Sequence, residues 1–315
     1  MLQRRFPALR RSEFNAAMKF QPKKVLVFYK KSMYQIHALE RKEPRILELL
    51  EKNDMTVEKI LRNHREHTES IEEVREGLKE AGLHSDFVCK EDMKSSAGYD
   101  LVITVGGDGT FLEASHYVFD IPIMGVNSSP KDSVGIFCCS SKSNFRWKLK
   151  QLFQGELESI TVFRLRAVTD GVAVKEAALN DILFANRIPS ATSRYFLEIK
   201  GKTEEQKSSG IWISTAAGST AAIRSAGGKP LTLGSRRMQY IVRELMSERA
   251  RNLTLSGGVL GVGDKIVIRS KMMDGQIYID GSTLSCHVPI GSCLEILGGQ
   301  APLTILGFSD YSRET

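Results

Sequence analysis

The sequence predicts a chain of two units, an α/β unit with a parallel sheet followed by a mostly β unit. Residues 24–29 and 100–105 have the apolar character of buried strands, and residues 43–83 repeat apolar side chains at helical spacing. Beyond about Phe163 the chain changes to short β-branched and aromatic segments separated by glycine turns. Strands that alternate with helices indicate a parallel sheet, and short strands between turns indicate a β domain.

The first twenty residues are rich in arginine, and Glu13 is their only acid. We expect residues 1–20 to form a basic leader without fixed structure. Its composition is that of a mitochondrial transit peptide, but a short extension ahead of an internal start at Met18 would look the same, and serine is scarce. We therefore expect a cytoplasmic protein, or a mitochondrial one if the leader is a transit peptide.

We assign the α/β unit to residues 21–150 and the β-rich unit to residues 151–299, with the tail from about 300 to 315 able to pack back on the first unit. In the first unit, Gly82 stops the helical pattern, and residues 87–89 indicate a short strand. The strands predicted for the second unit are residues 196–199, 210–213, 265–268, 276–279 and 293–297.

Composition excludes several classes of protein. The five cysteines are odd in number and include no C-x-x-C pair, which argues against a disulfide framework or a cysteine zinc site and favours a reducing compartment. No apolar run reaches the roughly 18 residues that would span a bilayer. The net charge of +7 comes from dispersed basic residues without interleaved aromatics. We expect no membrane, nucleic-acid or protein-bound metal partner.

The sharpest motif is Gly106-Gly107-Asp108-Gly109-Thr110, directly after the predicted strand 100–105 and before a helix that we expect over residues 111–118. Glycines allow a tight turn that brings backbone N–H groups to phosphate oxygens, and the following helix N-terminus favours the same anions. A carboxylate among phosphates suits a magnesium ligand or a base that accepts a proton from an attacking hydroxyl. The alternative is a tight turn with Asp108 as a helix N-cap.

A second motif, residues 207–222, is a strand followed by small residues that permit close approach to a flat ring. Its hydroxyls can bond a base edge or a phosphate, and a tightly packed helix start is the alternative. These hydroxyls belong to Ser214, Thr215, Ser219 and Thr220.

A third motif is the pair Asn180-Asp181, which can bond ribose hydroxyls but is also an ordinary turn pair. Among the histidines, we expect His64 and His67 to lie on a solvated helix face, and His116 to pack near the glycine loop or support it. Asp280-Gly281, after a predicted strand, fits a hairpin turn at least as well as a functional element.

In this order, GGDGT, LND at 179–181 and TAAGSTA at 215–221 resemble the NAD kinase family over about residues 24–306. The likeness is closest to the organellar and plant NADH-kinase-like branch, through KSSG at 207–210, TAAGSTAA and MQYIVRE at 238–244. GGDGT alone is shared with lipid kinases, so the second glycine block is what points to NAD.

The resemblance implies a Rossmann-like N-terminal domain, a β-rich C-terminal domain and a dinucleotide held between them. It further implies ATP-dependent phosphorylation of the adenosine-ribose 2′-hydroxyl of NAD or NADH, with Mg²⁺ or another divalent cation, by a homodimer. Asp108 would be the base, and Asn180 and Asp181 would hold a ribose or the adenine. The other implied binding residues are Gly106, Gly107, Gly109, Thr110, Asn127, Thr215, Gly218, Ser219 and Thr220.

This sequence departs from the family pattern in two loops. Ala216, Ala217 and Ala222 replace the proline, threonine and tyrosine of the usual STPTGSTAY, and the glycine-rich segment at Asn127 is altered. Two alternatives stay open on the sequence: a lipid or sphingoid-base kinase, against which the hydroxyl-rich loop argues, and a non-catalytic NAD(P)-binding sensor. NAD or NADH preference, ATP or polyphosphate as donor, and the oligomeric state are not fixed by the sequence.

Overall fold

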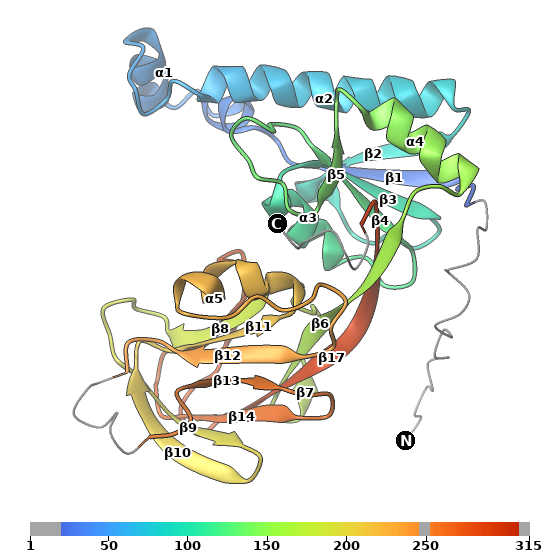
Figure 1. Cartoon of the computed structure of the whole chain (residues 1–315). Helices are drawn as coiled ribbons and strands as arrows, with labels where there is room; N and C mark the ends of the chain where they lie inside the picture. The colour runs from blue at the N-terminus through green and yellow to red at the C-terminus, as the bar shows by residue number, and fades with distance from the viewer. Residues whose placement is uncertain (1–19, 246–252, 309–315) are drawn as a thin grey trace.

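The α/β lobe is the upper part of the computed structural model in Figure 1, and the β lobe lies below it. The model describes residues 20–245 and 253–308, so the expected leader, except for its last residue, and the end of the tail lie outside the described residues. Five parallel strands in the order β5-β4-β3-β1-β2 form the upper sheet. They are β1 Lys24–Tyr29, β2 His84–Cys89, β3 Leu101–Gly106, β4 Ile123–Asn127 and β5 Cys138–Ser141.

Helices cover both faces of this sheet. Alternation along β1 sends Val25 and Val27 into a core with α2 and α4, and Leu26 and Phe28 into a core with α3. No helix of the described ranges is long and apolar enough to cross a membrane. The helical elements are a π-helix η1 Tyr34–Glu40, α1 Pro44–Glu51, α2 Ile60–Glu80, a 3-10 turn η2 Lys90–Asp92, α3 Asp108–Ser115 and α4 Phe145–Gln154.

Two helix boundaries differ from the sequence expectation. The helical pattern over 43–83 belongs to two helices, because Asn53 has a φ of 50° and the Asp54 carboxylate accepts hydrogen bonds from the backbone and hydroxyl of Thr56. Such an aspartate turn competes with helix. The helix after the glycine loop spans Asp108–Ser115 instead of 111–118, so its first turn contains the motif itself.

The β lobe consists of two sheets packed face to face. One has the order β13-β12-β11-β8-β15-β16, and the other includes β10-β9-β14-β17 with β6 and β7 beside β17. All five predicted segments coincide with strands, namely β9, β11, β14, β15 and β17. The bounds are β6 Ser159–Thr169, β7 Val172–Ala173, β8 Asp181–Asn186, β9 Ser193–Ile199, β10 Lys202–Ser208, β11 Ile211–Thr215, η3 Ala217–Thr220, α5 Ala222–Ser225, β12 Met238–Val242, β13 Gly257–Leu260, β14 Lys265–Ser270, β15 Gly275–Ile279, β16 Leu284–His287 and β17 Cys293–Leu306.

The long strand β17 runs from the lower lobe into the upper one (Figure 1). It pairs antiparallel with β14 and β6, and Ile305 pairs parallel with Ile123 of β4. Its register against β6 shifts near Gln300, where Ala301 has a φ of 39°. The parallel upper sheet and one lower sheet are therefore a single hydrogen-bonded sheet of eleven strands.

Arg164 of β6 is a buried cation at the junction of the lobes. Its guanidinium donates to the carbonyls of Ser115, the last residue of α3, and of Val118, at 2.6 and 3.0 Å, and to that of Ala301 of β17 at 2.8 Å. Burial lowers the pKa of Arg164 to about 10, so the side chain is still charged at neutral pH. A cation at the negative end of α3 also complements the helix dipole. Sequence reasoning did not single out this residue.

We expect Arg164→Met to lower the free energy of unfolding by about 3 kcal/mol, because several buried carbonyls lose their donor. Urea unfolding measures the effect. The control is Arg166→Ala on the same strand, where a half-exposed side chain is removed and the change should stay within about 0.5 kcal/mol. Equal stability of the two variants would contradict the role given to Arg164.

Candidate active site

The glycine loop lies at the carboxyl end of β3, the edge at which open α/β sheets bind ligands. An added Cβ at Gly106 would lie 2.2 Å from Thr110 Oγ1, and one at Gly107 would lie 2.6 Å from Ser133 Oγ. At Gly109 the nearest atom would be Lys30 Nζ, at 3.9 Å. Close packing inside the loop therefore requires glycine at position 106, whereas a Cβ at Gly107 would displace only the Ser133 hydroxyl and one at Gly109 would make an ordinary contact.

Asp108 is the first residue of α3, and Gly107 is the helix N-cap. The Asp108 side chain makes no capping bond; its Oδ1 accepts a hydrogen bond from the backbone N–H of Phe137 at 2.8 Å. The alternative that Asp108 serves as an N-cap is therefore wrong. The carboxylate is half-buried and held through one oxygen beside the loop.

A cationic cavity of about 310 Å³ opens beside this loop, at the carboxyl ends of β1, β3 and β4. Its lining combines lysines, small residues and the start of α2, which suits an anion with several oxygens. The lining residues are Lys30, Lys31, Ser32, Met33, Lys59, Ile60, Asn63, His67, Gly106, Gly107, Thr110, Ser128 and Ser129.

His67 ties two walls of this cavity together. Its Nε2 lies 2.7 Å from the Lys30 carbonyl and its Nδ1 lies 2.9 Å from Ser128 Oγ. Burial lowers its pKa and favours the neutral ring. His64 is also bonded, with Nδ1 2.8 Å from Ser32 Oγ. The expected solvated helix face is therefore wrong, because the segment after β1 bonds both histidines and the loop after β4 bonds His67.

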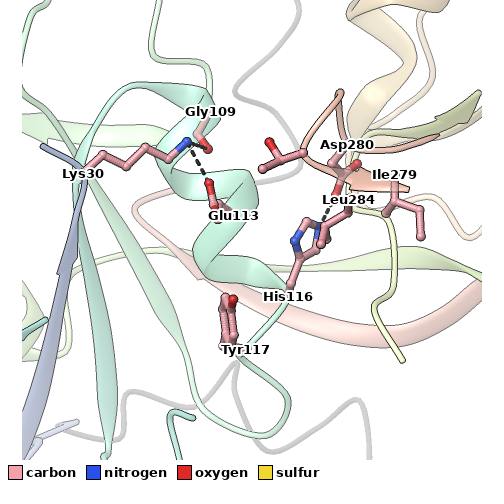
Figure 2. A pocket seen from close by; sticks show the side chains of 9 residues that line it. Lys30, Gly109, Glu113, His116, Tyr117, Ile279, Asp280 and Leu284 are labelled. Atoms are coloured by element: carbon pink, nitrogen blue, oxygen red, sulfur yellow. Dashed lines mark hydrogen bonds and ion pairs between the residues drawn. The ribbon is translucent and has the colours of Figure 1, made fainter. Parts of the chain in front are cut away.

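Lys30 connects the glycine loop to α3. Its Nζ donates to the Gly109 carbonyl at 2.9 Å and pairs with Glu113 at 2.9 Å (Figure 2). Glu113 also pairs with Lys90 at 2.8 Å. These ions border a second cavity, of about 140 Å³, between α3 and the turn that follows β15. No local sequence signal marks Lys30 or Glu113, since their pairing joins distant segments.

Asn127 closes the loop after β4. Its Nδ2 donates to the Ser133 carbonyl and its Oδ1 accepts from the Ser129 N–H, both at 3.0 Å. An added Cβ at Gly135 would lie 2.3 Å from Asn127 Nδ2. The Asn127 amide is thus used within the loop, and the neighbouring Ser128 and Ser129 line the cavity.

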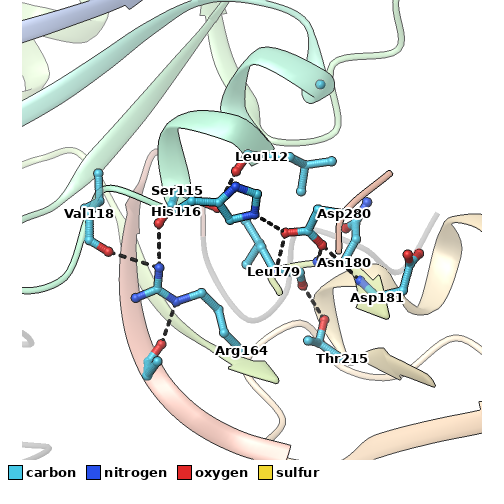
Figure 3. Close-up of polar contacts among 12 residues, drawn as sticks. Leu112, Ser115, His116, Val118, Arg164, Leu179, Asn180, Asp181, Thr215 and Asp280 are labelled. Carbon is cyan, nitrogen blue, oxygen red and sulfur yellow. Dashed lines mark hydrogen bonds and ion pairs between the residues drawn. The ribbon is translucent and has the colours of Figure 1, made fainter. Parts of the chain in front are cut away.

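The pair Asn180 and Asp181 begins β8, and Asp280 organises it. The Asp280 carboxylate accepts backbone hydrogen bonds from Leu179, Asn180 and Asp181, at 2.8, 2.7 and 3.1 Å. It also accepts one from His116 Nε2 at 2.9 Å (Figure 3). Asp280 has a φ of 50° in the turn between β15 and β16, so the hairpin interpretation is confirmed.

Two buried polar atoms near this turn have no hydrogen-bond partner among the described residues. Asn180 Oδ1 and Ser214 Oγ are buried without a hydrogen bond, and Ser214 is the register partner of Asp181 across β8 and β11. Burial, with the nearby charge of Asp280, raises the pKa of Asp181 to about 7. Buried polar atoms without partners indicate a place where a ligand completes the hydrogen bonding.

The small-residue loop after β11 packs directly on this turn. Thr215 Oγ1 donates to the Leu179 carbonyl at 2.5 Å and accepts from the Gly218 N–H at 2.9 Å. Ser219 Oγ donates to the Ala216 carbonyl at 2.7 Å. Both hydroxyls thus shape the loop itself, and Thr220 is the exposed residue at its end.

The structure brings the predicted groups together through α3. Asp108 lies at the first residue of this helix, and His116, directly after its last residue, contacts Asp280 beside Asn180 and Asp181. Gly109 of the glycine loop and Asp280, which holds the backbone of Asn180 and Asp181, line the same cavity between the lobes. Within the described residues, no group of three or more histidines, cysteines or acids could hold a metal ion.

Comparison with known proteins identifies relatives of this chain. Residues 22–157 match the family model described as ATP-NAD kinase N-terminal domain. A probable NADH kinase of Oryza sativa subsp. japonica is 32% identical over 262 residues, which cover 76% of this chain and 80% of that protein. An NADH kinase of Arabidopsis thaliana is 32% identical over 220 residues, 62% of this chain and 69% of that protein.

The fold has a solved counterpart. The crystal structure of an NAD kinase from Archaeoglobus fulgidus in complex with ATP matches with a TM-score of 0.64, over 92% of this chain and 95% of that one, at 19% identity. This likeness in fold confirms the predicted arrangement of an α/β domain followed by a β-rich domain.

The raised pKa of Asp181, about 7, predicts a pH-dependent stability. The unfolded value is about 3.9, so the contribution of this group to stability is complete below about pH 4 and is lost as pH rises through 7. Between pH 5 and 8 we expect the wild type to lose about 2 kcal/mol relative to Asp181→Asn. Urea unfolding across this range measures it, and parallel curves for the two proteins would contradict it.

Gly218 is required by its neighbour, since an added Cβ would lie 2.0 Å from the Asn180 carbonyl oxygen. We expect Gly218→Ala to lower the melting temperature by roughly 5 °C, because the loop or the turn must move. The control is Gly261→Ala, where the Cβ would make an ordinary contact of 3.6 Å with Asp264. If both variants have the melting temperature of the wild type, the close packing of Gly218 against Asn180 does not contribute to stability.

Proposed function

Since the chain belongs to the NAD kinase family, we propose that it transfers the γ-phosphoryl group of ATP to the 2′-hydroxyl of the adenosine ribose of NAD or NADH. The observation that carries this proposal is the arrangement around α3. One end of this helix holds Asp108 beside a cationic cavity, and the other end contacts the Asp280 turn that shapes Asn180 and Asp181. A phosphate donor and a nucleoside acceptor can then meet at Asp108.

In the proposed reaction, Asp108 accepts the proton of the 2′-hydroxyl while that oxygen attacks the γ-phosphorus and ADP leaves. The bond from Phe137 N–H to Asp108 Oδ1 orients the carboxylate for this step. Phosphoryl transfer otherwise depends on positioning and neutralisation of charge. We assign the phosphates to the backbone of Gly106, Gly107, Gly109 and Thr110, and to the lysines of the adjoining cavity.

The dinucleotide is assigned to the unsatisfied polar groups of the β lobe. Asn180 Oδ1 accepts from a ribose hydroxyl or the adenine amine, and Asp181 beside it donates or accepts according to pH. Thr215, Gly218 and Ser219 shape the loop that covers the ring, with Thr220 at its exposed end. We assign Asn127 to the shape of the loop on the phosphate side.

We propose that Mg²⁺, or another divalent cation, accompanies ATP. Proteins usually hold Mg²⁺ through one or two carboxylates together with substrate phosphates. Because Asp108 is assigned as the base, we assign the ion mainly to the phosphates of ATP. The ion would neutralise phosphate charge when bound.

The remaining assignments concern organisation. We propose domains at residues 21–150 and 151–299, and the pairing of Ile305 with β4 supports return of the tail to the first domain. We further propose a homodimer in the cytoplasm, or in mitochondria if residues 1–20 are a transit peptide, without nucleic-acid or membrane partners. Light scattering of the purified protein tests the oligomeric state.

The central prediction is that Asp108→Asn lowers turnover by about 10²- to 10⁴-fold, because the amide keeps the shape but cannot accept the proton. The assay supplies magnesium and ATP with NAD or NADH, and a coupled dehydrogenase reads NADP(H). Dinucleotide binding, measured by calorimetry, should stay within a few-fold of wild type.

A matched control is Asp274→Asn, at the far end of β15 from Asp280, where an exposed carboxylate pairs with Arg187. It should retain full activity. Full activity of Asp108→Asn would contradict the role of Asp108 as the base. No product from the wild type with ATP or polyphosphate, together with clear NAD binding, would favour a binding protein without catalysis.

A further inference from the structure

The contact between His116 and Asp280 is a buried polar link between the two lobes. The side chain of His116 is 5% exposed and that of Asp280 is fully buried. Oδ2 of Asp280 accepts from His116 and Leu179, while Oδ1 accepts from Asn180 and Asp181. His116 is thus the sole side chain among the hydrogen-bond donors that the described residues supply to this carboxylate, and the other donors are backbone groups of the turn.

The link spans the parts of the proposed active site. α3 has eight residues, from Asp108 to Ser115, which makes it about 12 Å long, and His116 follows at once. A helix of this length is stiff, so a shift of His116 against Asp280 moves the Asn180 turn relative to Asp108. Displacements of about 1 Å at a reaction centre can change rates by 10²-fold.

The fold does not need this link to keep α3 in place. Arg164 holds the carbonyls of Ser115 and Val118, and Lys30 holds the amino-terminal turn through Gly109 and Glu113. A cavity of about 140 Å³ lies beside the pair and gives the turn room to move (Figure 2). Loss of the His116 contact would therefore alter the alignment of the lobes more than the stability of the helix.

We propose that His116 is a positioning residue: by donating to Asp280 it fixes the Leu179–Asp181 backbone against α3 and so aligns the dinucleotide ribose with Asp108. This inference rests on the proposed function. It separates two tasks within one helix, since the glycine loop at the amino end meets the phosphoryl donor and His116 at the carboxyl end sets where the acceptor lies.

The test compares His116→Ala with His116→Gln, whose amide nitrogen can replace Nε2 as a donor. We expect His116→Ala to lower kcat by about 10- to 100-fold and to raise the KM for NAD or NADH. The KM for ATP should change less than twofold. His116→Gln should recover most of kcat. The control is His287→Gln, an exposed histidine at the far end of β16 from the site, which should keep wild-type kinetics.

A double-mutant cycle with Asp280→Asn locates the effect. Asparagine keeps only one acceptor oxygen for the four donors of this cluster, so Asp280→Asn disturbs the same cluster as His116→Ala, and the double variant should lose less than the two single losses combined. Additive losses would overturn the proposal. Kinetic constants of His116→Ala within twofold of wild type, with only a lower melting temperature, would overturn it too, because that is the result of a packing role.

Failure of the proposed function would look different. If the wild type turns over neither NAD nor NADH, calorimetry of NADH binding replaces the kinetics, and His116→Ala should weaken binding at least tenfold while His116→Gln restores it. Unchanged binding would then overturn the positioning role independently of catalysis. If His116→Ala does not fold, His116→Leu, which fills similar space but has no donor, replaces it in the same comparisons and in the cycle.

Discussion

The proposed site depends on the hydrogen bonds that the Asp280 carboxylate accepts. It is fully buried, and it is stabilised by four hydrogen-bond donors from two lobes. A buried charge of this kind is tolerated only where its hydrogen bonds are complete. The turn at 179–181, the hairpin after β15 and the end of α3 must therefore meet, because separation of any of them would leave the carboxylate short of donors.

Arg164 supplies the complementary constraint on the other side of α3. It is a buried cation surrounded by carbonyl oxygens of α3 and of the irregular part of β17. The left-handed residue Ala301 turns its carbonyl toward this guanidinium where the β6 register shifts. Arg164 thus joins β17, which runs through both lobes, to α3, which lies between them. Polar contacts therefore help to set the arrangement of the lobes, in addition to apolar packing.

Local signals in the sequence predicted local structure well. β1 has the predicted bounds of Lys24–Tyr29, and the glycine motif stands between a buried strand and a helix as expected. The sequence did not predict the break between the two helices at Asn53, because apolar residues continue at helical spacing on both sides of it. Asp280 and His116 are 164 residues apart, and the partners of Arg164 lie as far away as Ala301. Periodicity in the sequence does not reveal such pairs, so the sequence proposed candidate site residues but not the contacts that hold them in place.

Two of the three departures from the family pattern in the small-residue loop, Ala216 and Ala217, are at buried positions. Ala216 and Ala217 are 1% and 2% exposed, so these positions pack against the protein and present no side-chain surface to a ligand. Thr215 and Ser219 bond the loop and the neighbouring turn. In the proposed function, recognition therefore falls to backbone groups of the loop and to Asn180, Asp181 and Ser214, which are polar residues beside it. A loop that recognises its ligand through its backbone depends on its shape, and that shape depends on Gly218 packing against Asn180.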